Sequence, residues 1–413
     1  MGTPASTPAP EVAEPHSHTP DLKSARGVAT YCAGIYDRKS EQPAVADFNR
    51  AHRGDGLRAR FRRLPAAPDP HFRRLAKLLG RGCDVALVDF TWIAELAYGG
   101  LVSDLTDYVR PREPEFMRAP LEAVRWEGGY WGVPRSADAG LLYYEAGAGP
   151  PETWQELYER ARGNDGLVYQ GAAYESLTVH FLELAYGAGA TVLSADGEHS
   201  ELDSPESLRA LQLMIRGIEQ EAVLPEVLRY DEEDARLAFA EGRASYMRNW
   251  AYAEELMSEP DPESGYRRSG YDYIELPAFE GGKAASVLAG YAVVVADEPR
   301  DRDAALALAD HLTGPDAVRE AARRAHLAPA LADSWSDGLV TGPLPIWPEL
   351  ERSIEQARPR PVTPAYPLVS AAIYRNVHAA LSGEVSPEDA LRRADQEIEA
   401  ALAQVRVPRG EAS

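Results

Sequence analysis

Residues 133–144 have the sequence VPRSADAGLLYY, and this stretch decides how the chain folds. A proline near its start suits a loop, Asp138-Ala139-Gly140 suits a bend, and the apolar residues that follow predict a buried strand. A helix should begin soon afterwards, within residues 150–157 (PPETWQEL), because proline fits the first helical turn and early acidic residues suit the helix dipole. The stretch therefore places a carboxylate, Asp138, where the chain crosses from one structural unit to another.

The chain has 413 residues, more than one hydrophobic core usually supports, so two lobes are expected. Hydrophobic residues make up 45% of it and charged residues 26%, which leaves enough apolar material for two cores. The net charge of -22 argues against nucleic acid and anionic membrane surfaces as partners, because both would repel the chain. No apolar stretch of the sequence is long enough to cross a bilayer.

Strands and helices are predicted to alternate in the first part of the chain. They comprise strands at 27–36, 57–64 and 83–89 and helices at 42–51 and 72–79. Such alternation implies a parallel sheet, and ligands bind such sheets beyond the carboxyl ends of the strands. Asp89 lies at one of these ends and the loop after Cys32 at another.

A second bend followed by an apolar strand occurs at residues 288–295 (LAGYAVVV). Two such crossings would join one lobe to the other and back, so that each lobe is discontinuous in sequence. The predicted lobes are 27–137 with 290–338 and 138–289 with 339–408, between a disordered leader or linker at 1–26 and a tail at 409–413. Further helices are predicted from Ser204-Pro205-Glu206 onward, at 232–240, 301–312 and 315–325, and after residue 386.

Cys32 and Cys83 are the only cysteines, too few for a disulfide framework or a zinc site. Each lies in or beside a predicted strand, where a small buried thiol is the simpler interpretation, and a bridge between the two is the alternative. The first 25 residues lack a basic start followed by an apolar core, so no signal peptide is expected in them. Either an export signal has been removed or the protein stays in the cytoplasm.

Catalytic and metal-binding signatures are missing from the sequence. Its nine histidines form no His-Glu-x-x-His pattern, and there is neither a glycine-rich phosphate loop nor a Gly-x-Ser-x-Gly elbow. No metal and no cofactor are therefore expected. The acidic run at residues 231–234 (DEED) is interpreted as the charged start of a helix rather than as a catalytic pair.

Aromatic residues recur instead beside polar side chains at the ends of predicted strands. They are found in Asp89-Phe90-Thr91-Trp92, Tyr169-Gln170-Gly171, Tyr174-Glu175, Arg248-Asn249-Trp250 and Gly290-Tyr291, and at Arg360 and Tyr366. Flat rings cover the apolar face of a sugar while carboxylates, amides and arginine satisfy its hydroxyls, so the mixture fits a neutral polyol. For any single aromatic, packing in the core is an equal alternative.

Several segments, in their order and spacing, resemble one known family. These are residues 84–89 (DVALVD) with Trp92, residues 133–144, residues 151–154 (PETW), Tyr169-Gln170-Gly171 with Tyr174-Glu175, Arg248-Asn249-Trp250 with Tyr252-Ala253, and Pro359-Arg360-Pro361 with Pro364. Together they resemble the carbohydrate-binding proteins of ABC importers, which are family 1 of the extracellular solute-binding proteins, and in particular the trehalose/maltose-binding branch. The similarity extends from about residue 27 to residue 405.

The resemblance implies a two-lobed fold of the type II periplasmic-binding-protein kind, in which each lobe is a mainly parallel sheet flanked by helices. The lobes would close by a hinge on a di- or oligosaccharide, and the protein, a monomer without enzymatic activity, would dock to the transmembrane subunits of a permease. Its location would be the periplasm or the outer face of the cytoplasmic membrane. A non-exported sugar sensor or scaffold is the first alternative, and an enzyme using Asp89 and Asp138 as acid and base is the second.

The resemblance also implies roles for particular residues. Asp89 and Asp138 would accept hydrogen bonds from hydroxyls, and Trp250 would stack on a ring. Arg360 would donate to ring or glycosidic oxygens, and Gly290 would bring its backbone close to the ligand. Glu41 and Arg63 are weaker candidates. Ser136 stands where the family often has an aromatic residue, and Tyr291 follows Ala289-Gly290 where the family has a Gly-Gly-Trp pattern. Both would face the ligand, and both changes would alter the shape of the pocket.

Overall fold

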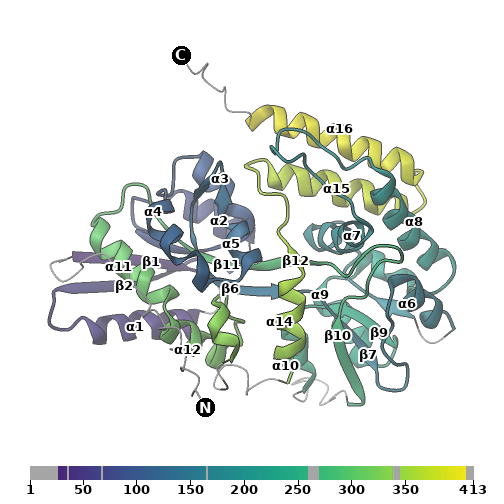
Figure 1. The fold of residues 1–413 in the computed structure, drawn as a ribbon, viewed down its shortest axis with the longest axis horizontal. Helices are drawn as coiled ribbons and strands as arrows, with labels where there is room; N and C mark the ends of the chain where they lie inside the picture. Colours follow the sequence, from purple (N-terminus) through teal and green to yellow (C-terminus); the bar gives the residue numbers. More distant parts are fainter. Residues whose placement is uncertain are drawn as a thin grey trace, which may run out of the picture.

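The computed structural model describes residues 27–34, 37–66, 68–163, 166–258, 269–336, 338 and 345–405. These residues form two α/β lobes that lie side by side, each with its own sheet (Figure 1). The predicted leader at 1–26 and the predicted tail at 409–413 lie outside the described residues. The first and second lobe are defined below by the elements around the first and second sheet.

The first sheet has the strand order β12-β11-β3-β1-β2, with β6 paired to β11. Its strands are β1 (Gly27–Ala33), β2 (Leu57–Arg63), β3 (Val85–Asp89), β6 (Val133–Ala139), β11 (Ser286–Val295) and β12 (Ala357–Arg358). β1 runs parallel to both β2 and β3, as the alternation of strands and helices predicts, whereas β11 is antiparallel to β3 and β6. A separate hairpin is formed by β4 (Arg125–Trp126) and β5 (Gly129–Tyr130).

The second sheet has the order β10-β7-β9-β8. Its strands are β7 (Leu141–Glu145), β8 (Leu167–Val168), β9 (Tyr246–Asn249) and β10 (Tyr271–Glu275). Only β8 and β9 are parallel, which differs from the expectation of a mainly parallel sheet in each lobe. The reason is that β7 and β10 connect directly to strands of the first lobe, so neither needs the helical crossover that parallel neighbours require.

The first predicted crossing is present at Gly140, which separates β6 of the first sheet from β7 of the second. A side chain there would overlap the ends of the buried Arg248 and Glu183 side chains, so a larger residue would displace this ion pair. The second crossing lies earlier than predicted, between β10 and β11, and β11 continues through Gly290 as a strand paired with β6. Figure 1 shows β6 and β11 extending together from one lobe toward the other.

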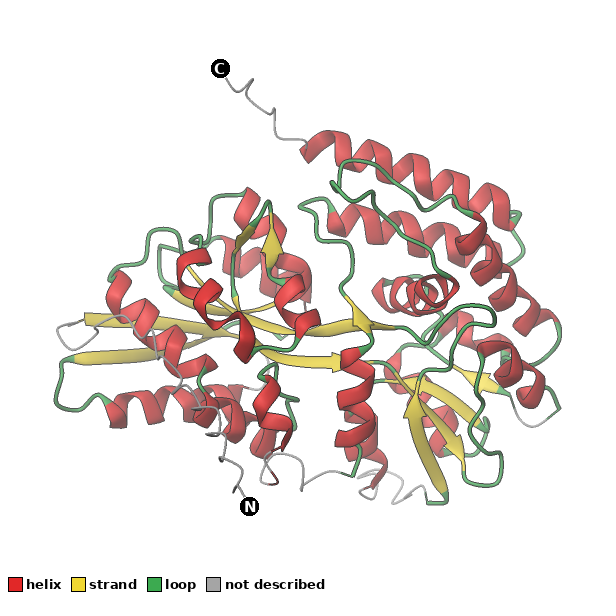
Figure 2. Ribbon diagram, in the orientation of Figure 1, coloured by secondary structure: helices red, strands yellow, loops and turns green. Residues whose placement is uncertain are grey.

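Helices flank both sheets (Figure 2). Those of the first lobe are α1 (Gln42–Ala51), α2 (Pro68–Ala76), α3 (Ile93–Tyr98), α4 (Thr106–Val109), α5 (Arg118–Ala123), α11 (Arg302–Thr313) and α12 (Pro315–Ala325), with short 3-10 or π segments at η2 (Asp37–Glu41), η3 (Phe90–Trp92), η4 (Arg110–Glu115) and η6 (Ala332–Ser336). α2 begins four residues before the predicted start at Phe72, because proline at its first position suits a helical start. The side chain of Asp301 caps α11 by accepting a hydrogen bond from the backbone of Ala304.

The second lobe is richer in helix. Its helices are α6 (Trp154–Ala161), α7 (Glu175–Ala188), α8 (Pro205–Glu219), α9 (Glu232–Ala240), α10 (Tyr252–Ser258), α14 (Trp347–Glu355), α15 (Tyr366–Leu381) and α16 (Pro387–Val405), with η5 at Pro225–Arg229. Thr153 and Ser204 cap α6 and α8, as their sequence signatures predict. Helix α14 contacts both sheets, α7 is buried along nearly its whole length, and α15 packs against α7 and α16.

Cys32 and Cys83 form a disulfide, with their Cα atoms 5.8 Å apart. The alternative interpretation as a bridge is therefore the one that the structure contains, and the buried-thiol interpretation is wrong. Both residues are fully buried in the first lobe, where the bond ties β1 to the segment before β3. None of the helices in the described part of the chain is long and apolar enough to cross a membrane.

Candidate functional site

A cavity of about 540 Å³ lies between the two lobes. Seven of the nine predicted site residues line it, which supports the predicted site as a group. They are Asp89, Ser136, Asp138, Trp250, Gly290, Tyr291 and Arg360. The paired strands β6 and β11, the end of β3 and the positions that follow β9 and β12 supply these seven residues, because the lobes meet along the β6–β11 pair.

Arg360 connects the two lobes at one wall of the cavity. Its Nη2 lies 3.3 Å from Oδ1 of Asp89, which ends β3, and its Nη1 donates to Oε1 of Glu175, which starts α7, at 2.8 Å. Burial alone would lower the pKa of Arg360, but the carboxylates of Asp89 and Glu175 raise it above its ordinary value. Arg360 is thus held as a cation, and its Nε is buried without a hydrogen-bond partner among the described residues.

Asp89 is oriented by the turn that follows it. Its Oδ1 accepts hydrogen bonds from the backbone nitrogen of Thr91 at 2.8 Å and from the Thr91 hydroxyl at 2.7 Å, so it caps η3. The strand end therefore presents a carboxylate in one fixed direction toward Arg360.

Ser136, Asp138 and Gly290 belong to the β6–β11 pair, where Asp138 lies opposite Ala289 and Gly290 opposite Ala137. Gly290 has φ +132, and a side chain there would overlap the carbonyl oxygen of Ser136, so only glycine fits. Ser136 is 3% exposed, and its Oγ lacks a hydrogen-bond partner in the described structure. Burial raises the pKa of Asp138 to about 7, although the backbone N–H of Ala139 donates to it and opposes the shift.

Glu41 and Arg63 do not line the cavity. The pairing of β6 with β11 shifts register next to Tyr291, and Arg135 in the shifted segment lies in the interior, where its Nη2 is 3.0 Å from Oε1 of Glu41. Glu41 also accepts hydrogen bonds from Tyr31 and Ser40, so its carboxylate is used inside the first lobe.

Arg63 lies in β2, at the exposed carboxyl end of an edge strand. It is therefore not brought to the cavity, and neither Arg63 nor Glu41 is retained below as a ligand-binding residue.

Trp250 follows β9 and is held against a buried ion pair. The guanidinium carbon of Arg248 is 4.2 Å from the centre of the Trp250 ring, and Arg248 pairs with Glu183 in the interior. The backbone of Trp250 is fixed as well, because its nitrogen donates to Asn249 at 2.8 Å and its carbonyl accepts from the Tyr143 hydroxyl at 2.9 Å. One ring face is thus covered by protein, and the half-buried ring still borders the cavity.

The cavity also contains acidic residues that the sequence patterns do not assign to it. In the sequence, Glu175 stands in an aromatic-polar pair with Tyr174, and the run 231–234 is predicted to start a helix. The latter prediction is confirmed, since Asp231 accepts from the backbone of Glu233 and Asp234 in a capping box. The same turn borders the cavity, because α9 begins beside the end of β9.

Glu255 of α10 makes a contact across the cavity from the second lobe to the first. Its Oε1 lies 3.4 Å from Nζ of Lys39 in η2, and its Oε2 lies 2.8 Å from Nδ1 of His326, which follows α12. Burial alone would raise the pKa of Glu255, but these two partners lower it below its ordinary value. The contact joins the lobes at a point remote in sequence from Arg360.

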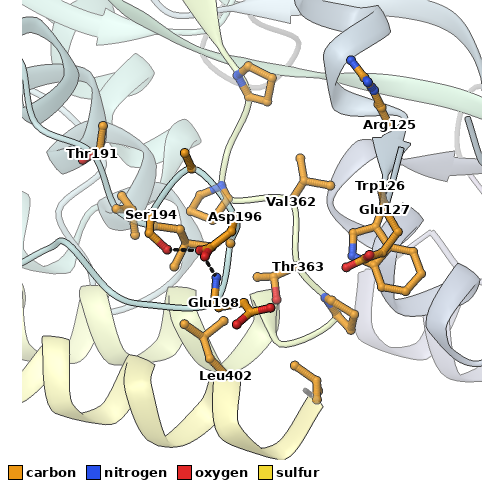
Figure 3. Close-up of a pocket in the computed structure, with 18 of the residues that line it drawn as sticks. Arg125, Trp126, Glu127, Thr191, Ser194, Asp196, Glu198, Val362, Thr363 and Leu402 are labelled. Carbon is orange, nitrogen blue, oxygen red and sulfur yellow. Dashed lines mark hydrogen bonds between the residues drawn. The ribbon is translucent and has the colours of Figure 1, made fainter. Parts of the chain in front are cut away.

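A larger cavity, of about 1130 Å³, borders the β4–β5 turn, the loop at 191–198, the segment 358–364 and the end of α16 (Figure 3). None of the nine predicted residues lines it. Pro359 and Pro361 face this larger cavity while Arg360 lies in the smaller one, so one extended segment borders both. Its polar groups are partly used locally, since Asp196 accepts from Ser194 and from the backbone of Glu198.

Comparisons with known proteins agree with the resemblance seen in the sequence. The profile of the bacterial extracellular solute-binding protein family matches residues 74–319. A probable ABC transporter-binding protein of Deinococcus radiodurans is 29% identical over 342 residues, which cover 76% of this chain and 79% of the relative.

Solved structures with the same fold include maltose-bound MalE3 of T. maritima, which is 30% identical with a TM-score of 0.76 over 90% of this chain and 99% of that one. The cyclic alpha-maltosyl-1,6-maltose binding protein of Arthrobacter globiformis superposes with a TM-score of 0.77 over 92% of this chain and 100% of that chain, at 22% identity. This second likeness concerns the fold alone. The predicted two-lobed periplasmic-binding-protein fold is confirmed.

Proposed function

This chain belongs to the bacterial extracellular solute-binding protein family, and we propose that it captures a di- or oligosaccharide between its lobes and delivers it to the permease of an ABC transporter. The observation that carries the proposal is Arg360, which joins Asp89 of the first lobe to Glu175 of the second at the wall of the cavity. A ligand bound there contacts both lobes at once. Such a ligand would therefore stabilise the closed arrangement, to the extent that it binds the closed arrangement more tightly than the open one.

The chemistry of the cavity wall suits a sugar. Trp250 offers a flat ring, while Asp89 and Asp138 accept hydrogen bonds from hydroxyls. Two buried polar atoms without partners in the described structure, Ser136 Oγ and Arg360 Nε, are groups that a polyol oxygen can satisfy. A volume of about 540 Å³ is within the range of small-molecule sites.

The lobes are assigned at the expected bounds, 27–137 with 290–338 and 138–289 with 339–408, except that all of β6 and β11 and the short strand β12 belong to the sheet of the first lobe. The hinge lies where β6 passes into β7 at Gly140 and where β11 pairs with β6 around Gly290. Gly290 brings its backbone to the ligand, and Ser136 and Tyr291 on the paired strands shape the pocket beside it. With the hinge at these two positions, the lobes can rotate relative to each other, and residues of both lobes continue to line the cavity.

The ligand is bound and released without chemical change. Asp89 is held by Arg360 and by two donors from Thr91, and these contacts fix the direction of its carboxylate. A saccharide that is recovered intact after prolonged incubation with the protein supports binding without catalysis. Hydrolysis products that disappear with Asp138→Asn would instead favour the enzyme alternative.

The protein acts as a monomer at the outer face of the cytoplasmic membrane or in the periplasm. The family is extracellular by its description, and a fully buried Cys32–Cys83 disulfide is typical of oxidising compartments. Both observations favour transport over a cytoplasmic sensor or scaffold. Fractionation of cells expressing the full-length gene tests this, since accumulation of the protein in the cytoplasm with both thiols free would contradict it.

Thermal-shift screening followed by titration calorimetry tests the binding function. Mono-, di- and oligosaccharides are added one at a time, and a ligand of the folded state raises the melting temperature as its concentration exceeds its dissociation constant. We expect at least one di- or oligosaccharide to bind with one site per chain. The absence of any stabilising saccharide across neutral, basic and acidic sugars would overturn the proposal.

A further inference from the structure

The cavity between the lobes is strongly acidic. Seven carboxylate side chains line it, whereas its cationic side chains are Lys39 and Arg360, with His326 as a third basic group. The seven are Asp89, Asp138, Glu175, Asp231, Glu232, Glu233 and Glu255. Carboxylates accept hydrogen bonds from the hydroxyls of a sugar, but this cavity holds more of them than its cationic side chains can offset.

Four of these carboxylates are already compensated by cations. Arg360 pairs with Asp89 and Glu175. Lys39 and His326 pair with Glu255, and Arg236, which lies outside the cavity, pairs with Glu233 at 2.8 Å. These ion pairs are internal to the protein. They engage every basic side chain that the structure describes on the cavity wall, so none of them remains to offset the other carboxylates.

The remaining three, Asp138, Asp231 and Glu232, have no cationic side chain within 4 Å in the part of the chain that the structure describes. Backbone groups at the start of α9 partly offset Asp231, and Glu232 accepts hydroxyl hydrogens from Tyr174 and Ser176. Hydrogen bonds of this kind orient a carboxylate but leave its charge in place.

Asp138 is the clearest of the three. The cation whose charge acts on it is Arg248, which is fully buried and engaged with Glu183. Burial outweighs this attraction and raises the pKa of Asp138 to about 7. A positive charge on a ligand beside Asp138 would favour the charged form of the carboxylate more than a neutral hydroxyl does.

A metal ion does not meet this need as well as an organic cation does. Among the described residues no three His, Cys, Asp or Glu side chains are grouped closely enough to hold a metal. An organic ammonium needs only one or two acceptors and tolerates carboxylates that are spread over a cavity wall.

We propose that the preferred ligand is a carbohydrate that carries a basic nitrogen, such as an amino sugar or an oligosaccharide that contains one, with its ammonium beside Asp138 or beside Glu232 on the cavity wall. The proposal rests on the carbohydrate-binding function above and names its substrate class. The aromatic and hydroxyl-accepting groups hold the sugar rings, and the uncompensated carboxylates select the charge. Sugar phosphates and uronic acids are excluded by repulsion.

Matched saccharides that differ only in the nitrogen test this proposal by titration calorimetry at pH 7. The β-linked set is chitosan disaccharide, its N-acetylated counterpart and cellobiose, and the α-linked set is 2-amino-2-deoxytrehalose and trehalose. We expect the basic member of at least one set to bind about 10-fold or more tightly than its neutral counterparts at low salt. Its advantage should shrink at high salt, because salt screens charges that are partly exposed.

Glu232→Gln serves as the diagnostic variant, since the amide oxygen of glutamine can accept from one of the hydroxyls of Tyr174 and Ser176 while its amide nitrogen donates to the other. We expect it to weaken the basic saccharide about 5-fold while the neutral one changes less than 2-fold. Glu122→Gln is the control, because Glu122 pairs with Arg118 on the surface of α5, outside the cavity.

Two outcomes would count against the proposal, and they differ. Equal or tighter binding of the neutral members would overturn the charge preference and leave the carbohydrate-binding function standing. No binding by any member of either set, together with no stabilisation by other saccharides, would overturn both.

Discussion

The guanidinium carbon of Arg248 lies 4.2 Å from the centre of the Trp250 ring. Arg248 is fully buried and paired with Glu183, so the ring rests on a charge that is itself fixed in the interior. The aromatic wall of the cavity is therefore positioned by the core of the second lobe. Its orientation does not depend on a ligand.

Trp250→Ala should weaken saccharide binding roughly 10- to 100-fold, because it removes the only described tryptophan on the cavity wall. The melting temperature should change little, since the ring is only half-buried. Titration calorimetry and thermal unfolding measure the two effects. Trp126→Ala is the matched control, as Trp126 is also half-buried but borders the larger cavity. Equal losses of affinity in the two variants would refute the site.

Arg248→Met should lower the free energy of unfolding by roughly 3–5 kcal/mol, because it leaves Glu183 charged and buried without its main partner. Denaturant titration measures this loss. The comparison is Arg118→Met, whose side chain is 90% exposed beside Glu122 and whose removal should cost at most about 0.5 kcal/mol. Similar losses of unfolding free energy in the two variants would show that the buried Arg248–Glu183 pair contributes no more to stability than an exposed pair.

Much of this arrangement follows from local sequence patterns. The crossing after Asp138 and the helix starts at Thr153 and Ser204 depend on residues within a few positions of one another, and the structure contains all three. Asp89 and Asp138 could be expected at the cavity because strand ends converge at one edge of a sheet.

Other features depend on contacts between distant segments, which single-sequence patterns do not reveal. Glu41 matches a family position, yet a register shift in β6 brings Arg135 against it and uses it in the core. The sequence predicts only that Glu232 belongs to the charged start of a helix. The packing of α9 beside β9 brings this residue to the cavity. The disulfide between Cys32 and Cys83 likewise depends on β1 lying next to β3.

Removing the disulfide with Cys32→Ala/Cys83→Ala should lower the free energy of unfolding by about 4 kcal/mol, since the bond closes a loop of 51 residues in sequence separation. Denaturant curves of the variant and of the oxidised protein measure the difference. Alkylation of the unreduced, unfolded protein should find no free thiol. Two reactive thiols under those conditions would contradict the bond.

The stability of the protein should depend on the ionisation of Asp138. Its pKa is about 7 in the folded protein and about 3.9 in an unfolded chain, so between these values the folded state holds a proton that the unfolded state has released. The free energy of unfolding of the wild type, relative to Asp138→Asn, should therefore fall as pH rises from about 4 to 7. The slope should be at most about 1.4 kcal/mol per pH unit, and the difference should level off above pH 7.

Denaturant titrations of both proteins between pH 4 and 8.5 measure this difference. Asp301→Asn provides a control, because Asp301 caps α11 in the first lobe and does not line the cavity. A difference between wild type and Asp138→Asn that is constant over the whole range would contradict the raised pKa.

Glu255→Gln should shift the unliganded protein toward the open form. The change removes the charge that joins Glu255 to Lys39 and His326 across the cavity, and partly exposed pairs of this kind contribute about 0.2–1 kcal/mol each. Because a saccharide that bridges the lobes binds the closed form, its apparent affinity should fall about 2- to 5-fold. Small-angle scattering should give an unliganded radius of gyration at least as large as that of the wild type, and equal radii for both proteins at saturating ligand.

High salt offers an independent check of this contact, since it should weaken binding by the wild type more than binding by Glu255→Gln and so bring the two affinities together. Glu349→Gln is the control, because Glu349 pairs with Arg352 on α14 and makes no contact across the cavity. If Glu255→Gln and Glu349→Gln bind with the same affinity at every salt concentration, Glu255 does not hold the lobes together. The closed arrangement would then depend on Arg360 alone among the ion pairs described across the cavity.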